Sequence, residues 1–368
     1  MGNLAEMLKT RDNNFNFIRI VAALFVLVSH AYPLSRGATE VEPLVAQLGI
    51  SLGGLGVFTF FCISGFFISM SYDRSSTWVD FVVARFLRLY PALLVVLVLS
   101  AFLIGPIFTV MNLHDYFSSS EVYSYVMGNL KLKDISFQLP GLFQDNPYPG
   151  INGSLWTLYY EVLLYVLVLV LGVVGFLKGI LRLSVFFVLY FLFYFTFKFL
   201  LGEGYIDPGF KLRMWVQWGF AFVVGMAFYA YRVDIRLDYR IAGTCWLISL
   251  LLYKSPIFVE VFVIAWSYSV FCIAFNTQSF ARQYNKLGDY SYGLYIYAFP
   301  VQEILAHLWR GISPMAMIFV ALPLALVPAM LSWHFIEYPC ILRKRTMALR
   351  LSKLLAKFSK IFVRYTTK

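Results

Sequence analysis

Long apolar segments recur along the whole chain, and they constrain its fold more than any other feature. A helix needs about 20 largely apolar residues to cross a bilayer. The chain is 60% hydrophobic, with a mean hydropathy of +0.74, which is more apolar than a typical soluble domain. The sequence therefore predicts an all-α, polytopic integral membrane protein. We expect about ten transmembrane helices, at 15–34, 50–72, 86–110, 154–175, 183–201, 212–231, 241–255, 256–276, 289–309 and 315–338.

The basic residues predict how these helices are oriented. Lys and Arg are concentrated before the first span, in alternate connections and after the last span. Because cytoplasmic segments carry the excess of positive charge, this pattern places both termini in the cytoplasm. The net charge of +11 comes from residues between apolar runs, so it indicates topology and phosphate contacts rather than nucleic-acid binding. We expect a transmembrane domain over 1–340 and a basic, amphipathic cytoplasmic tail over 341–368 that lies on anionic lipid.

Arg19 and His30 form the first candidate site, inside the first predicted span. Three helical turns separate them, so they fall within about 20° of one face and about 16 Å apart along the axis. Ionisable residues at membrane depth are expensive and are functional candidates by default. A cation suits an anionic ligand, and an imidazole suits proton transfer near neutral pH. The alternative is a structural histidine bonded to a helix carbonyl.

Two further segments place charges in or beside predicted spans. Arg85 and Arg88 are three residues apart on one helix face, where two guanidinium groups suit a phosphate-rich ligand; plain positive-inside anchoring is the alternative. Glu161 lies about two turns into the fourth span, with Thr157 on the same face. We expect His30 or an arginine as its partner, and a purely structural ion pair between helices is the alternative.

Two remaining segments carry polar residues whose interpretation stays open. Asp289 is expected to cap the helix that follows it. The tyrosines after it either line a pocket or form an interfacial aromatic belt. Glu303 and His307 share a face near the other end of this span, but two candidate ligands are too few for a metal site, so none is expected. The four cysteines lack metal-ligand spacing and predict no disulfide framework.

Taken together, six segments resemble the membrane acyltransferase-3 family, whose members modify bacterial envelope polysaccharides. The resemblance runs from about Asn13 to Pro339 and departs from the family pattern at Ile20, usually Gly, and at Tyr297, often His. No role of that second histidine is carried over. The matching segments, in chain order, are Phe17–His30, Leu55–Phe66, Arg85–Pro91, Gly153–Glu161, Leu287–Tyr295 and Glu337–Pro339.

The resemblance implies an O-acyltransferase of the bacterial inner membrane. It would move an acyl group, usually acetyl, from cytoplasmic acyl-CoA to a hydroxyl of a glycan outside. His30 would be the general base or a transient acyl carrier, and Glu161 would orient or stabilise it. Arg19, Arg85 and Arg88 would bind acyl-CoA.

The resemblance also implies an acceptor site near the start of the fourth span. Trp156 would line it, because aromatic faces suit sugar rings, with Ser154 and Tyr160 beside it. No cofactor and no metal are expected. O-antigen is the expected acceptor. Capsule, exopolysaccharide, peptidoglycan, a lipooligosaccharide signal and a macrolide are alternatives.

Two other functions fit the same buried charges. A transporter or flippase for a lipid-linked glycan also needs a polar cavity at membrane depth, although the sequence has no visible repeat relating its halves, as many transporters do. A passive scaffold or sensor would not need His30 and Glu161 within the membrane.

Overall fold

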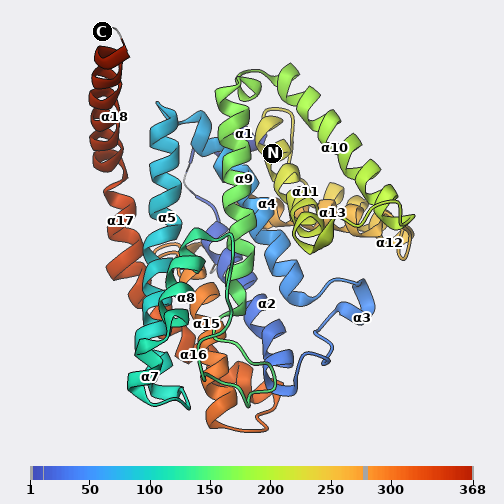
Figure 1. Cartoon of the computed structure of the whole chain (residues 1–368). Coiled ribbons are helices and arrows are strands. Elements are labelled where there is room, and N and C mark those ends of the chain that lie inside the picture. The colour runs from blue at the N-terminus through green and yellow to red at the C-terminus, as the bar shows by residue number, and fades with distance from the viewer. Residues whose placement is uncertain (1–2, 11, 277–280, 367–368) are drawn as a thin grey trace.

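The computed structural model describes residues 3–10, 12–276 and 281–366, and the side chains among these up to residue 357. Over these residues the protein is a bundle of α-helices, with isolated bridges but no β-strand (Figure 1). The helices are α1 (Leu4–Met7), α2 (Phe15–Arg36), α3 (Val45–Leu48), α4 (Leu52–Asp73), α5 (Trp78–Leu99), α6 (Gly105–Phe108), α7 (Leu113–Ser118), α8 (Ser120–Lys131), α9 (Trp156–Val173), α10 (Ile180–Gly202), α11 (Gly209–Ala230), α12 (Tyr239–Leu251), α13 (Phe258–Asn276), α14 (Ala281–Tyr284), α15 (Ser291–Leu308), α16 (Pro314–Ser332), α17 (Tyr338–Leu342) and α18 (Lys344–Thr366).

Each apolar segment that the sequence singled out coincides with a helix, so the all-α membrane architecture is confirmed. α12 is short, whereas α11 and α15 carry charged or polar residues that lower their hydropathy. The count of ten spans and the location of the termini stay predictions. Within the described residues, 7 helices or helix runs are long and apolar enough to cross a membrane: Phe15–Arg36, Leu52–Asp73, Trp78–Phe108, Gly153–Val173, Ile180–Gly202, Phe258–Asn276 and Pro314–Leu342.

The centre of the bundle depends on glycines that let helices touch. A Cβ on Gly65 of α4 would lie 1.9 Å from the Phe222 carbonyl oxygen of α11, and one on Gly225 of α11 would lie 1.9 Å from the Cys62 carbonyl oxygen of α4. Small residues at such contacts let helix backbones approach closely in membranes. α2 packs on the same central helix, because a Cβ on Gly56 would lie 2.4 Å from the Ala22 carbonyl oxygen.

The connection between α6 and α9 folds against the end of the bundle where α2 finishes. Asn146 donates hydrogen bonds to the Glu303 carbonyl oxygen (3.0 Å) and side chain (2.6 Å), and Asn152 donates to the Ile296 carbonyl oxygen (2.8 Å). These three bonds tie the connection to α15. The connection therefore forms an ordered wall over this end of the protein.

At the opposite end, α18 runs past the start of α5 and extends beyond the bundle (Figure 1). Its buried Ala348 packs with Val79, Val83 and Leu87 of α5. The boundary of a separate tail at residue 341 stays a prediction, because α17 and α18 follow α16 through a single π-helical turn at Trp333–Glu337.

Candidate active site

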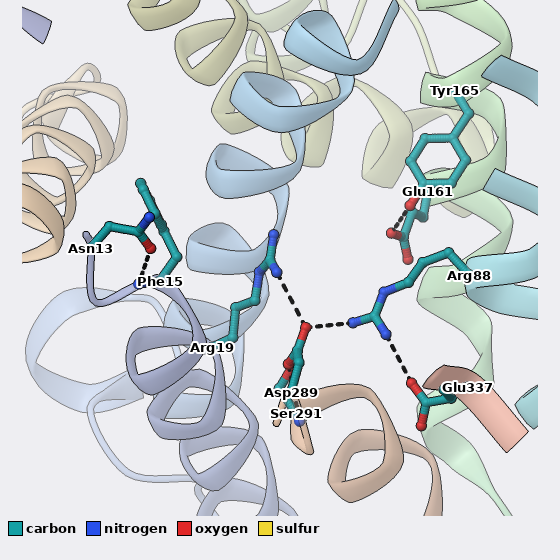
Figure 2. A network of polar contacts seen from close by, with 9 residues as sticks. All are labelled: Asn13, Phe15, Arg19, Arg88, Glu161, Tyr165, Asp289, Ser291 and Glu337. Carbon is teal, nitrogen blue, oxygen red and sulfur yellow. Dashed lines mark hydrogen bonds and ion pairs between the residues drawn. The ribbon is translucent and has the colours of Figure 1, made fainter. Parts of the chain in front are cut away.

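A buried ion-pair network joins four distant parts of the chain. Arg88 of α5 donates to Asp289 (2.7 Å), just before α15, and to Glu337 (2.8 Å), in the π-helical turn after α16. Arg19 of α2 pairs with the same Asp289 oxygen at 3.2 Å (Figure 2). The side chains of Asp289 and Glu337 are only 7% and 1% exposed. Breaking a buried pair leaves an uncompensated charge, so this network fixes how the four segments sit together.

Asp289 also lies at the start of its helix, where the sequence predicted a cap. Its Oδ1 accepts from the Ser291 hydroxyl (2.5 Å) and from the Ser291 backbone N–H (3.4 Å). The other oxygen, Oδ2, holds the two arginines. Tyr290, not Asp289, is the N-cap residue of α15, and its side chain makes no capping hydrogen bond, so the predicted position of the cap is wrong. The Asp289 carboxylate instead ties the first residue of α15 to Arg19 and Arg88.

Glu161 and Arg85 lie beside this network without joining it. Glu161 of α9 accepts a hydrogen bond from the Tyr165 hydroxyl, one turn further along the helix (Figure 2). The Arg85 guanidinium lies 5.9 Å from the centre of the same tyrosine ring. Among the described residues Arg85 has no carboxylate partner within salt-bridge distance, and its Nε has no hydrogen-bond partner. Arg85 is thus the arginine of this cluster that no carboxylate of the described residues holds.

These side chains surround a cavity of about 100 Å³, which we call the arginine cavity. Helices α2, α4, α5, α9 and α15 contribute to its wall. Its apolar lining includes Phe60, Phe61 and Phe67, and the Arg19 guanidinium lies 5.2 Å from the Phe67 ring centre. Its polar lining consists of Arg19, Ser64, Arg85, Arg88, Thr157, Glu161, Tyr165, Ser291, Tyr292 and Tyr295.

His30 lines a second, larger cavity of about 440 Å³, which we call the histidine cavity. It lies towards the end of α2, because Pro33 and Leu34 line it as well. Seven aromatic residues contribute to its walls, and two carboxylates, Glu40 and Glu42, come from the connection after α2. The aromatic residues are Phe137, Tyr148, Trp156, Phe210, Trp218, Tyr295 and Phe299.

The imidazole of His30 has an aromatic and an acidic neighbour. The Phe299 ring packs edge-on at 5.3 Å between ring centres. Glu42 accepts a hydrogen bond from the Ser29 hydroxyl and interacts electrostatically with His30. The Nδ1 atom of His30 is buried without a hydrogen-bond partner in the described part of the chain. His30 therefore has a free ring nitrogen and a carboxylate close by, which is an arrangement suited to proton transfer.

The predicted site residues separate between the two cavities. Arg19, Arg85, Arg88 and Glu161 line the arginine cavity, whereas His30 lines the histidine cavity. Arg19 and His30 share one helix, as predicted, and look into different chambers. The sequence offered His30 or an arginine as the partner of Glu161. In the structure Glu161 lines the same cavity as the arginines and not the cavity of His30.

Of the three residues predicted to bind the acceptor, one lines a cavity and two do not. Trp156 lines the histidine cavity. Ser154 and Tyr160 are buried next to it, and neither belongs to the described lining of either cavity. Tyr160 instead packs its ring against Trp156, at 5.6 Å between centres.

Glu42 is the site residue that the sequence analysis missed. It lies between two predicted spans in a connection without hydrophobic periodicity, so no pattern marked it. Glu337 appeared only as part of a closing motif, and its pairing with Arg88 spans 249 residues. The one available signal for Glu42 was its place as an acidic residue shortly after the span that carries His30.

Comparison with known proteins identifies the family of the chain. A model of the acyltransferase domain known as acyltransferase-3 matches residues 12–334. The chain therefore belongs to this family of membrane acyltransferases, and it is an O-acyltransferase.

Two curated relatives are similar over different extents. An O-acetyl transferase of Shigella phage Sf6 is 30% identical over 342 residues, covering 89% of this chain and 95% of that protein. Nodulation protein 10 of Rhizobium leguminosarum bv. viciae is 31% identical over 173 residues, covering 45% of this chain and 46% of that protein. No solved structure matches the chain significantly.

Among the described residues, no group of three or more His, Cys, Asp or Glu side chains is placed to hold a metal ion. Glu303 and His307 lie near the Asn146 contact rather than in either cavity.

Proposed function

We propose that this acyltransferase moves an acyl group, most readily acetyl, from cytoplasmic acyl-CoA to a hydroxyl of a cell-envelope glycan such as O-antigen. The observation that carries the proposal is the pair of adjoining cavities along α2, one lined by arginines and the other by a histidine and aromatic rings. The name of the phage relative, an O-acetyl transferase, supports acetyl as the group transferred.

The proposed topology places the protein in the bacterial inner membrane with ten spans and both termini in the cytoplasm. It is supported by the excess of Lys and Arg at the end of the bundle where α2 begins and α18 extends. The arginine cavity then lies nearer the cytoplasm, where acyl-CoA is made, and the histidine cavity nearer the outer surface, where the glycan is presented.

At the donor end, we assign the three arginines different roles. Arg88 is held by two carboxylates, so it maintains the cavity, and Arg19 shares one of them. Arg85 has an Nε without a partner among the described residues and contacts the phosphate or thioester oxygen of acyl-CoA. Glu161 with Tyr165 keeps the cluster close to neutral, which lowers the cost of burying three cations.

At the acceptor end, His30 takes the proton of the attacking hydroxyl as general base. The hydroxyl oxygen forms a bond to the acyl carbon, the carbon–sulfur bond breaks, and CoA leaves as a thiolate that takes up a proton. Glu42 stabilises the imidazolium that forms. Transfer from thioester to ester needs no cofactor and no metal. Holding donor and acceptor in line supplies much of the rate acceleration.

The acceptor glycan lies against the aromatic wall of the histidine cavity. Trp156 and Trp218 offer ring faces to a sugar, with their centres 6.2 Å apart. Tyr160 supports Trp156 from behind. Ser154 has a buried hydroxyl without a partner in the described chain and contacts the glycan only if the loop around it moves.

The experiment that tests this function compares His30→Ala with wild type in cells. Ester-linked acyl groups on the envelope glycan are measured by mass spectrometry at matched protein levels. We expect loss of decoration with unchanged amount and length of glycan. His114→Ala is the matched control, because His114 is 90% exposed in the connection after α6. Unchanged decoration in His30→Ala would refute the mechanism, and loss of the glycan itself from the surface would favour a flippase.

A further inference from the structure

The two cavities meet at a thin partition of three side chains. Val57 of α4, Thr157 of α9 and Tyr295 of α15 line both cavities. These residues are 7%, 5% and 7% exposed, so each is enclosed by protein on its remaining sides. No two of them come from the same helix, and the partition therefore depends on how three helices pack.

A single hydrogen bond closes the partition. The hydroxyls of Thr157 and Tyr295 lie 2.5 Å apart. The Thr157 hydroxyl also donates to the carbonyl oxygen of Ser154, in the 3-10 turn just before α9, at 3.4 Å. Thr157 thus keeps a partner when Tyr295 moves away, whereas the Tyr295 ring packs edge-on against Phe60 at 5.8 Å between centres. Opening the partition therefore requires breaking one hydrogen bond, and it leaves Thr157 with its other partner.

We propose that Tyr295 and Thr157 form a gate that admits the acyl group, but not water, from the arginine cavity to His30. This inference rests on the proposed function. The donor's charged part belongs with the arginines, and the proton acceptor lies beyond the partition. The acyl carbon must therefore cross the plane of Val57, Thr157 and Tyr295 before the acceptor hydroxyl can attack it. The pair acts as positioning and selecting residues rather than as a base.

A closed gate protects the thioester between turnovers. The histidine cavity is the larger of the two and is lined by Glu40, Glu42 and His30, so it holds water readily. Water reaching the acyl carbon would add its oxygen there, break the carbon–sulfur bond and release a carboxylic acid and the thiol of CoA. Excluding water is a general way to prevent such side reactions.

The same gate limits the size of the acyl group that can pass to His30. The arginine cavity is small, at about 100 Å³, and the phenol of Tyr295 closes it on the side facing His30. An acetyl group presents one methyl to this opening, whereas a butyryl group presents a chain that the Tyr295 and Val57 side chains must make room for. The gate therefore predicts a preference for acetyl that is set at this position.

The test uses the full-length protein in lipid nanodiscs with acetyl-CoA or butyryl-CoA and no glycan. Release of the CoA thiol reports hydrolysis. Tyr295→Phe and Thr157→Val remove the hydrogen bond and keep the volume, and we expect each to raise acetyl-CoA hydrolysis about tenfold. Thr157→Ala also removes volume, so we expect the ratio of butyryl to acetyl turnover to rise about fivefold. Thr157→Ser keeps the hydroxyl and should stay near wild type.

A matched control removes a similar bond elsewhere. Tyr231 pairs with the Ser184 hydroxyl at 2.6 Å, and neither residue lines the two cavities, so Tyr231→Phe should leave both readouts unchanged. The butyryl-to-acetyl ratio is independent of how much active protein each preparation contains. If every gate variant hydrolyses acetyl-CoA at the wild-type rate and has the wild-type butyryl-to-acetyl ratio, the gate is overturned and the proposed function is not. Absence of CoA release from either donor in every variant also overturns the gate, whereas the proposed function is overturned only by unchanged glycan acylation in His30→Ala.

Discussion

The two cavities that adjoin along α2 are built in opposite ways. The arginine cavity is small, and two of its arginines, Arg19 and Arg88, are held by carboxylates distant in sequence. The histidine cavity is about four times larger by volume, and its lining includes seven aromatic residues and two carboxylates from a connection. Ion pairs therefore fix the shape of the arginine cavity, whereas side-chain packing and the connections between helices shape the histidine cavity.

The largest effect is expected from removing the centre of the ion-pair network. Arg88→Ala leaves Asp289 and Glu337 buried without their shared cation, which costs about 3–5 kcal/mol of stability. We expect poor accumulation in the membrane and a lower unfolding temperature in detergent. The double variant Arg88→Met with Glu337→Gln should recover part of the loss. If Arg88→Ala unfolds at the same temperature as wild type, the stability of the protein around the arginine cavity does not depend on this ion-pair network.

A smaller effect, confined to rate, is expected in the histidine cavity. Glu42→Gln keeps the size and the contact with Ser29 and removes the charge that acts on His30. We expect turnover to fall about 100-fold, which is about 2.7 kcal/mol in the barrier, with an unchanged unfolding temperature. Glu40→Gln, in the same wall, is the matched control. Equal losses in both variants would contradict a specific role for Glu42.

A still smaller effect is expected where the acceptor binds. Trp156→Ala removes one aromatic face of the histidine cavity, and we expect KM for the glycan acceptor to rise about tenfold, or about 1.4 kcal/mol. The KM for acyl-CoA should stay as in wild type, because Trp156 does not line the arginine cavity in the described chain. Equal changes in both KM values would mean that the two chambers are not separate substrate sites.

The smallest effect is expected from Tyr165→Phe. It removes the hydroxyl that donates to Glu161 and keeps the ring under Arg85. The loss of one hydrogen bond to a charged group costs about 1.5–3 kcal/mol at most and less if water replaces it. We expect a two- to fivefold rise in KM for acyl-CoA and no change in the acceptor KM. A change in acceptor KM alone would assign Glu161 to the other chamber.

The helical segments were predictable because their signal is local. Apolar runs of membrane-spanning length identified α2, α4 and α5 without reference to the rest of the chain. The common helix face of Arg19 and His30 followed from helix geometry in the same way. Glu42 and the pairing of Arg88 with Glu337 carried no such signal, because a connection has no periodicity and the ion pair joins segments 249 residues apart.

The sequence by itself determined a helical membrane protein with ionisable residues at membrane depth, because hydropathy and helical periodicity act within one segment. Only the tertiary structure decided that Arg19 and His30 face different cavities, that Glu161 lies with the arginines, and that Thr157 and Tyr295 separate the two. Those relations depend on how helices from distant parts of the chain pack, as at the Gly65 and Gly225 contacts. A pattern within one helix fixes which way a side chain points and cannot fix what it meets there.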